Sequence, residues 1–60
     1  MRVEFINWFY YVNDTRVTGW RQFGTSWAWF HPNGAMATGD VWIDGVLHRF
    51  NDGGAWQGQV

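Results

Sequence analysis

The chain repeats itself every twenty residues, and this repeat restricts the possible folds more than any other feature of the sequence. When the segment from residue 19 is written above the segment from residue 39, glycine, aromatic and turn positions coincide. The same frame continues upstream with one residue missing from a turn. We therefore divide one module, residues 1–60, into a partial unit of about residues 1–18, a complete unit of about 19–38 and a third of about 39–60. The matching pairs include Gly19 with Gly39, Phe30 with Phe50, Gly34 with Gly54 and Ala35 with Ala55.

Each unit has the residue pattern of β-strands separated by tight turns. Three stretches are rich in aromatic and β-branched residues, which favour strands: Trp8–Val12, Trp27–Phe30 and Val46–Phe50. Turns are expected at residues 13–14, 32–34, 44–45 and 52–54, where Asn, Asp and Gly tolerate positive φ. Glycine or proline interrupts nearly every window after residue 19, so no long helix fits there, and the bulky Met1–Val12 segment also favours a strand. The predicted fold class is all-β, a short stack of β-hairpin repeats with no long helix.

Composition indicates how such a short chain is held together and which partners it lacks. There is no cysteine, which excludes a disulfide framework and a cysteine-ligated zinc site, so stability has to come from apolar burial. Aromatic residues make up 22 % of the chain, more than a small core needs, and we expect some rings to be exposed. The net charge is −1 and the four arginines are scattered, which argues against nucleic-acid binding. No apolar run is long enough to span a bilayer, and no signal peptide is visible.

The polar residues form no pattern typical of catalysis or metal binding. His31 and His48 lie seventeen residues apart, with no third ligand at the spacing of a metal site. The aspartates lie in or beside turns, where they bond locally, and they do not form a calcium loop. The sequence leaves open a carboxylate pair for glycoside cleavage, but it offers no sheltered acid and no nucleophile–base motif. We predict a protein that is not an enzyme and needs no metal or cofactor.

Three short motifs carry a resemblance to a known family. They are Gly19-Trp20, then Trp27-x-Trp29-Phe30, and then the stretch from Asn33 to Gly39. Together they resemble the choline-binding, or cell-wall-binding, repeat family of Gram-positive surface proteins and phage lysins. The match covers residues 8–58. The usual family unit differs mainly in having tyrosines where this chain has Ala28 and Trp29. The resemblance implies a β-solenoid of stacked hairpins, with ligand sites in the grooves between successive hairpins.

The resemblance also implies where a ligand binds. In choline-binding members each site is a box of aromatic rings, which attracts a quaternary ammonium group by cation–π interaction. Carried over to this chain, the clearest half-box is Trp20 with Trp27, and Met36 is its apolar partner. Arg49, at the edge of this box, is expected to donate hydrogen bonds to hydroxyl, carboxylate or phosphate groups of a glycan. The third wall of the box falls at Leu47, His48 or Arg49.

A second groove is predicted on the other side of the second unit. Trp8 and either Trp27 or Trp29 supply two of its walls, and Phe5 stands in for the missing Gly-Trp tryptophan of the first unit. The remaining aromatic residues are assigned to packing, and Trp42 is predicted to cap the end of the stack. The residues predicted to pack only in the core are Phe30, Phe50, Tyr10 and Trp56.

These expectations describe a non-catalytic module that anchors a larger secreted or cell-surface protein to a cell-wall polymer. The polymer is predicted to be a choline-bearing teichoic acid or a glucan. One alternative is a spacer or self-association repeat without a small ligand, in which a homodimer forms through the open ends of the stack. A more remote alternative, suggested by the spacing of Trp20 and Trp42, is a β module that binds proline-rich peptides. No nucleic-acid or membrane partner is expected.

Overall fold

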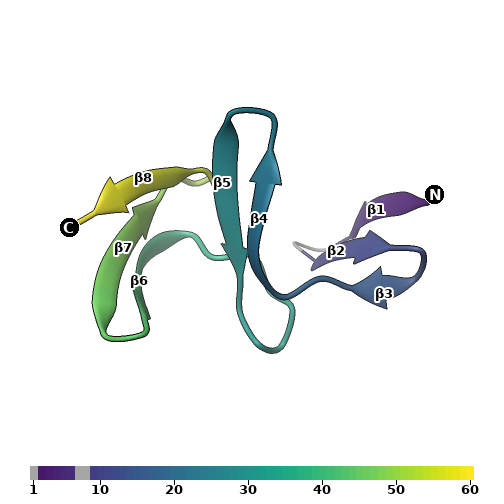
Figure 1. Cartoon of the computed structure of the whole chain (residues 1–60), viewed down its shortest axis with the longest axis horizontal. Coiled ribbons are helices and arrows are strands. Elements are labelled where there is room, and N and C mark those ends of the chain that lie inside the picture. The colour runs from purple at the N-terminus through teal and green to yellow at the C-terminus, as the bar shows by residue number, and fades with distance from the viewer. Residues whose placement is uncertain (1, 7–8) are drawn as a thin grey trace.

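The structure, a computed structural model, describes residues 2–6 and 9–60 and consists of short β-strands joined by tight turns (Figure 1). The strands of these residues form three antiparallel sheets, in the orders β1-β2-β3, β4-β5 and β6-β7-β8. The prediction of an all-β stack of hairpins is confirmed. The strand bounds are β1 (Val3–Ile6), β2 (Phe9–Val12), β3 (Thr15–Arg16), β4 (Gly19–Phe23), β5 (Ser26–Phe30), β6 (Gly39–Ile43), β7 (Val46–Phe50) and β8 (Trp56–Gln59).

Two-residue turns close the β2–β3, β4–β5 and β6–β7 hairpins and set their register. Asp44 and Gly45, between β6 and β7, both have positive φ (51° and 81°), which is the type I′ pattern that matches the twist of a hairpin. Asn13 and Asp14 form the corresponding turn between β2 and β3. The β4–β5 turn was not predicted, because Gly24-Thr25 lacks an Asn-Gly or Asp-Gly signal. Its first residue, Gly24, has a φ of 61° while Thr25 does not share the positive φ, which is the type II′ pattern.

The twenty-residue repeat is also a repeat of backbone hydrogen bonds. The N–H of His31 donates to the carbonyl of Ala35 (2.7 Å) and the N–H of Gly34 donates to the carbonyl of His31 (2.7 Å). One repeat later, the N–H of Asn51 donates to the carbonyl of Ala55 and the N–H of Gly54 donates to the carbonyl of Asn51, both at 2.9 Å. The coincidence of glycine and turn positions in the sequence therefore reflects one loop geometry that is used twice.

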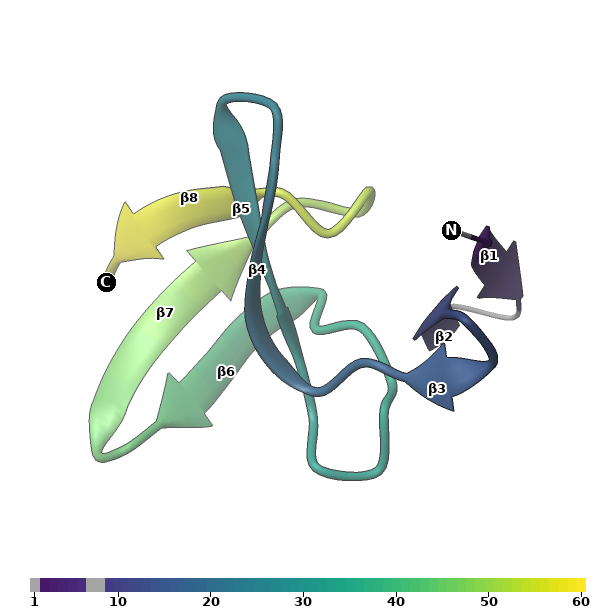
Figure 2. The ribbon, with the colours of Figure 1, turned by 45° about the vertical axis from the view of Figure 1, so that its right-hand side comes forward.

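The β4–β5 hairpin stands between the other two sheets and presents a different face to each (Figure 2). Side chains alternate along a strand. On the face toward the first sheet, the ring of Phe30 is fully buried and stacks on Tyr10, with ring centroids 6.0 Å apart. On the opposite face, Trp29 packs against the buried cluster of the third sheet. The buried residues of that cluster are Ala37, Ile43 and Phe50.

The first unit contains more strand than its sequence indicated. The Met1–Val12 segment was expected to be one strand, but β1 and β2 pair with each other as a hairpin. In that hairpin Phe5 lies opposite Tyr10, as Trp20 lies opposite Trp29 in the next unit. Phe5 therefore occupies the position of the Gly-Trp tryptophan. The part of the chain that the structure describes contains no helix long and apolar enough to cross a membrane.

Candidate functional site

Three indole rings and one imidazole surround a pocket between the second hairpin and the third sheet. The lining residues come from four strands: Trp20 from β4, Trp27 from β5, His48 from β7 and Trp56 from β8. The pocket has a volume of about 470 Å³. Its lining contains no ionised side chain of the acidic, lysine or arginine type, so the walls are aromatic throughout.

The register of the β4–β5 hairpin places the first two rings together. Trp20 lies opposite Trp29, and Trp27 lies opposite Gln22, so Trp20 and Trp27 are diagonal neighbours on one face. Their ring centroids are 6.5 Å apart and the ring planes meet at 80°. Each ring keeps about two fifths of its surface exposed, 40 % for Trp20 and 41 % for Trp27. The structure therefore brings Trp20 and Trp27 together, with both rings partly open to solvent.

His48 supplies the third wall, and strand alternation explains why it does so. His48 shares its face of β7 with the buried Phe50, whereas Leu47 and Arg49 point to the opposite face. The imidazole is only 8 % exposed, and its centroid is 5.4 Å from that of Trp20 at an angle of 71°. The sequence left three candidates for this wall, Leu47, His48 and Arg49. The alternation of side chains along the strand, counted from the buried Phe50, is the signal that selects His48.

Trp56 forms the fourth wall, which corrects its assignment to the core. The residue is 38 % exposed and its ring lies 6.0 Å from that of Trp20 at 85°. Its indole Nε1–H donates a hydrogen bond to Nδ1 of His48 (3.0 Å). Trp56 is the first residue of β8, which pairs with β7 through Phe50, and this pairing brings the indole beside His48. The repeat contained a signal for this role, because Trp56 is the counterpart of Met36.

Arg49 does not line the pocket. Its guanidinium donates to both carboxylate oxygens of Asp40, at 2.8 and 3.2 Å, on the face of β6 and β7 that points away from the second hairpin. This hydrogen-bonded pair lowers the pKa of Asp40 and raises the pKa of Arg49. The charge of Arg49 is thus matched by a carboxylate outside the aromatic box.

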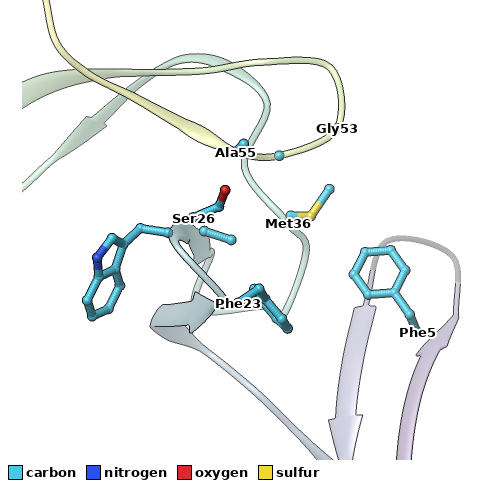
Figure 3. Close-up of a pocket in the computed structure, with 9 residues that line it drawn as sticks. Phe5, Phe23, Ser26, Met36, Gly53 and Ala55 are labelled. Atoms are coloured by element: carbon cyan, nitrogen blue, oxygen red, sulfur yellow. The ribbon is translucent and has the colours of Figure 1, made fainter.

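A second, smaller pocket of about 230 Å³ lies one repeat upstream, between the first and second hairpins (Figure 3). Phe5, Phe23 and Met36 lie around it. Phe5 takes the place that Trp20 has in the first pocket and Met36 that of Trp56, while Ala28 takes the place of His48. Met36, predicted beside Trp20 and Trp27, thus belongs to this second pocket, and Trp27 borders both pockets. The remaining lining residues are Ser26, Gly53, Gly54 and Ala55.

Three further tryptophans were singled out in the sequence, and the two that the structure describes, Trp29 and Trp42, do not line the pockets. Trp29 packs against the core and against the ring of His31, at 4.8 Å. Trp42 lies on the outer face of the last sheet and is 68 % exposed. Trp8 lies outside the described residues. Within residues 2–6 and 9–60, no group of three or more His, Cys, Asp or Glu side chains comes together in a way that could hold a metal ion.

Comparison with known proteins gives no match to a protein-family model and none to a curated protein sequence. Solved structures do match. Choline-binding protein F from Streptococcus pneumoniae, solved in the presence of a peptidoglycan analogue (tetrasaccharide-pentapeptide), superposes with a TM-score of 0.74 and 28 % identity over 90 % of this chain. CbpJ from Streptococcus pneumoniae TIGR4 superposes with a TM-score of 0.71 and 27 % identity over 92 % of it. The resemblance to the choline-binding repeat proteins is confirmed. This chain spans 19 % and 20 % of the lengths of those two chains.

In this choline-binding repeat fold, the larger pocket is a product of two neighbouring units. The second unit contributes Trp20 and Trp27, and the third contributes His48 and Trp56. Neither unit has more than half of the walls. The stacking of hairpins is therefore what creates the pocket.

Proposed function

We propose that this chain is a choline-binding module and that the pocket of Trp20, Trp27, His48 and Trp56 holds a quaternary ammonium group. The observation that supports this proposal is the set of three partly exposed indole rings around a space with aromatic walls. The face of an indole ring attracts a cation by about 0.5 to 1 kcal/mol when exposed and by about 2 kcal/mol when water is excluded. A quaternary ammonium group is a fitting cation because it cannot donate hydrogen bonds and loses little when it leaves water for an apolar box.

The proposed role follows from this site. The module would attach a larger secreted or cell-surface protein to a wall polymer that carries choline, such as a teichoic acid. The similarity to choline-binding protein F, solved with a peptidoglycan analogue, supports a cell-wall ligand. A glucan is the second candidate polymer, since one or two exposed indole faces are enough to stack on a sugar ring. In both cases the module would bind without catalysing a reaction.

Tryptophan fluorescence offers a direct test of the proposed site. Choline should quench the emission saturably, and Trp27→Ala should weaken its binding by about 3- to 30-fold, the equivalent of one lost cation–π wall. Trp27 is a suitable position because, among the described residues, its ring contacts no aromatic ring other than that of Trp20. Trp42→Ala is the matched control, since Trp42 is exposed and lies away from both pockets. Quenching by a soluble glucan but not by choline would assign the pocket to sugars, and a response to neither would favour a spacer.

One surface favours a second candidate function, self-association. Trp42 lies opposite Leu47, and the N–H of Val60 donates to the carbonyl of Leu47, so their side chains share the outer face of the last sheet. Trp42 and Val60 are both largely exposed. We propose that a second copy of the chain covers this face. Sedimentation should then show a dimer that Trp42→Gln converts to monomer, and a wild-type chain that stays monomeric at high concentration would rule out the homodimer.

A further inference from the structure

The hydrogen bond between Trp56 and His48 determines which ring nitrogen of His48 carries the proton. The indole Nε1–H of Trp56 can only donate, and it points at Nδ1 of His48 from 3.0 Å. Nδ1 must therefore be the unprotonated, accepting nitrogen. In a neutral imidazole the proton then lies on Nε2. The pocket wall thus presents a neutral ring whose remaining polar group is a donor.

This second nitrogen has no partner among the described residues but is not sealed off. Among the described residues, Trp56 is the only hydrogen-bond partner of the His48 side chain. Among the described residues, however, every side-chain nitrogen or oxygen that is fully hidden from solvent has a hydrogen-bond partner. Nε2 must therefore have some contact with solvent, although His48 as a whole is only 8 % exposed. His48 is one of the four residues that line the pocket.

A donor at this point has a clear chemical use if the pocket holds a quaternary ammonium group. Choline and its phosphate ester carry an oxygen two carbon atoms from the ammonium nitrogen. The arginine nearest in sequence, Arg49, is bound to Asp40 on the other face of the sheet, so it is not available inside the box. The smaller pocket has Ala28 at the equivalent position, and an alanine side chain cannot donate a hydrogen bond there.

We propose that the Nε2–H of His48 binds the oxygen of a choline group, either the free hydroxyl or the phosphate-ester oxygens. His48 is then a specificity-determining residue, because the box distinguishes choline-type ligands from a plain tetraalkylammonium ion. This inference rests on the proposed function, in which the three indole rings hold the ammonium group. Trp56 acts as a positioning residue that keeps the proton of His48 on the nitrogen facing the ligand.

The experiment compares tetramethylammonium, choline and phosphocholine by fluorescence titration. The wild-type chain should bind choline and phosphocholine about three- to tenfold more tightly than tetramethylammonium, the gain expected from one hydrogen bond. His48→Phe keeps a ring on the wall but removes the donor, so the three affinities should become equal while tetramethylammonium still binds. His48→Gln, whose amide can accept from Trp56 and donate to the ligand, should restore the preference.

The possible results separate the two proposals. If wild type binds tetramethylammonium and choline equally, or if His48→Phe keeps the preference, the role of His48 is disproved while the aromatic site stands. If the wild-type chain binds none of the three ligands, the proposed function itself fails. A measurement on the folded wild-type chain covers the case in which a variant does not fold. In a ¹⁵N spectrum of the imidazole, choline and phosphocholine should shift the Nε2 resonance and tetramethylammonium should leave it nearly unchanged, whereas equal shifts would contradict the proposal.

Discussion

At the scale of single residues, His48 combines two properties that rarely occur together at a cation site. It is buried between two indole rings, and it accepts a hydrogen bond from one of them. A proton on Nδ1 would set two donors against each other. The tautomer with its proton on Nε2 is therefore the one that fits the hydrogen bond from Trp56.

At the scale of elements, one wall of each groove is formed by two neighbouring residues, and these two residues differ from one repeat to the next. In the third sheet the pair is His48 and Trp56, and its equivalent one repeat earlier is Ala28 and Met36. In the first sheet the equivalent positions hold Phe9 and Arg16, where the guanidinium lies 4.5 Å from the centre of the ring. The backbone is the same in each repeat, but the side chains at these two positions differ. We therefore expect each groove to have its own ligand preference.

The loop that precedes β8 depends on one glycine and not on its neighbour. Gly54 is buried with a φ of 87°, and an added Cβ would overlap the end of the Met36 side chain. Gly54→Ala should therefore lower the free energy of unfolding by about 1 to 2 kcal/mol, the cost of a left-handed conformation for a residue with a Cβ. Gly53→Ala is the control: its Cβ would meet only Asn51 Oδ1, at 3.4 Å, and its φ is not positive, so the change should stay within about 0.5 kcal/mol. Urea denaturation measures both, and equal effects would show that the left-handed position is not required.

The pair of Asp40 and Arg49 joins β6 to β7 on the outer face and gives this hairpin a pH-dependent contribution. The hydrogen bond from Arg49 lowers the pKa of Asp40 from its ordinary value of 3.8. Because the folded-state pKa is the lower one, the contribution is present above pH 3.8 and is lost as the pH falls through the folded value. The difference in melting temperature between wild type and Asp40→Asn should be small, as for exposed ion pairs, constant between about pH 5 and 7, and should shrink as the pH is lowered below 3.8. A difference that persists at the lowest pH would show that the carboxylate charge is not its source.

The elements were more predictable than the residues of the site. Repeat spacing and turn chemistry predicted the hairpins, because few residue types adopt the positive φ that Asp44-Gly45 and the loop glycines have. Trp56 was misassigned to the core although its repeat counterpart, Met36, had been placed in a site, and the short β8 strand leaves it at the rim of the pocket. Met36 and Arg49 were placed in the box by family analogy. The partners of Met36 depend on which face of each hairpin meets which neighbour, and no local pattern encodes that. For Arg49, strand alternation relative to the buried Phe50 was a usable signal.

At the scale of the whole molecule, the stack has a small hydrophobic core. Phe30 is fully buried, and its ring centroid lies 6.0 Å from that of Tyr10 and 6.4 Å from that of Phe23. Because Tyr10 belongs to β2, its contact with Phe30 joins the second hairpin to the first. Phe30→Ala should cost about 3 to 5 kcal/mol. A chain of 60 residues has a total stability of about 3 to 9 kcal/mol, so this variant should be largely unfolded in a thermal melt. A melting temperature close to that of wild type would show that the hairpins are stable without their contact.

The milder variant Phe30→Leu links the stack to the ligand. It should lower stability without abolishing the fold, because leucine keeps part of the apolar volume. The pocket exists only while the second and third units are stacked, so a ligand that binds there binds the folded state alone. At a concentration of about one hundred times its dissociation constant, choline should add about 2.7 kcal/mol to the stability of this variant and raise its melting temperature. Adding Trp27→Ala to the same chain should reduce that gain at the same choline concentration, since the site loses a wall. A choline effect that survives unchanged in the double variant would mean that choline stabilises the chain through some other surface.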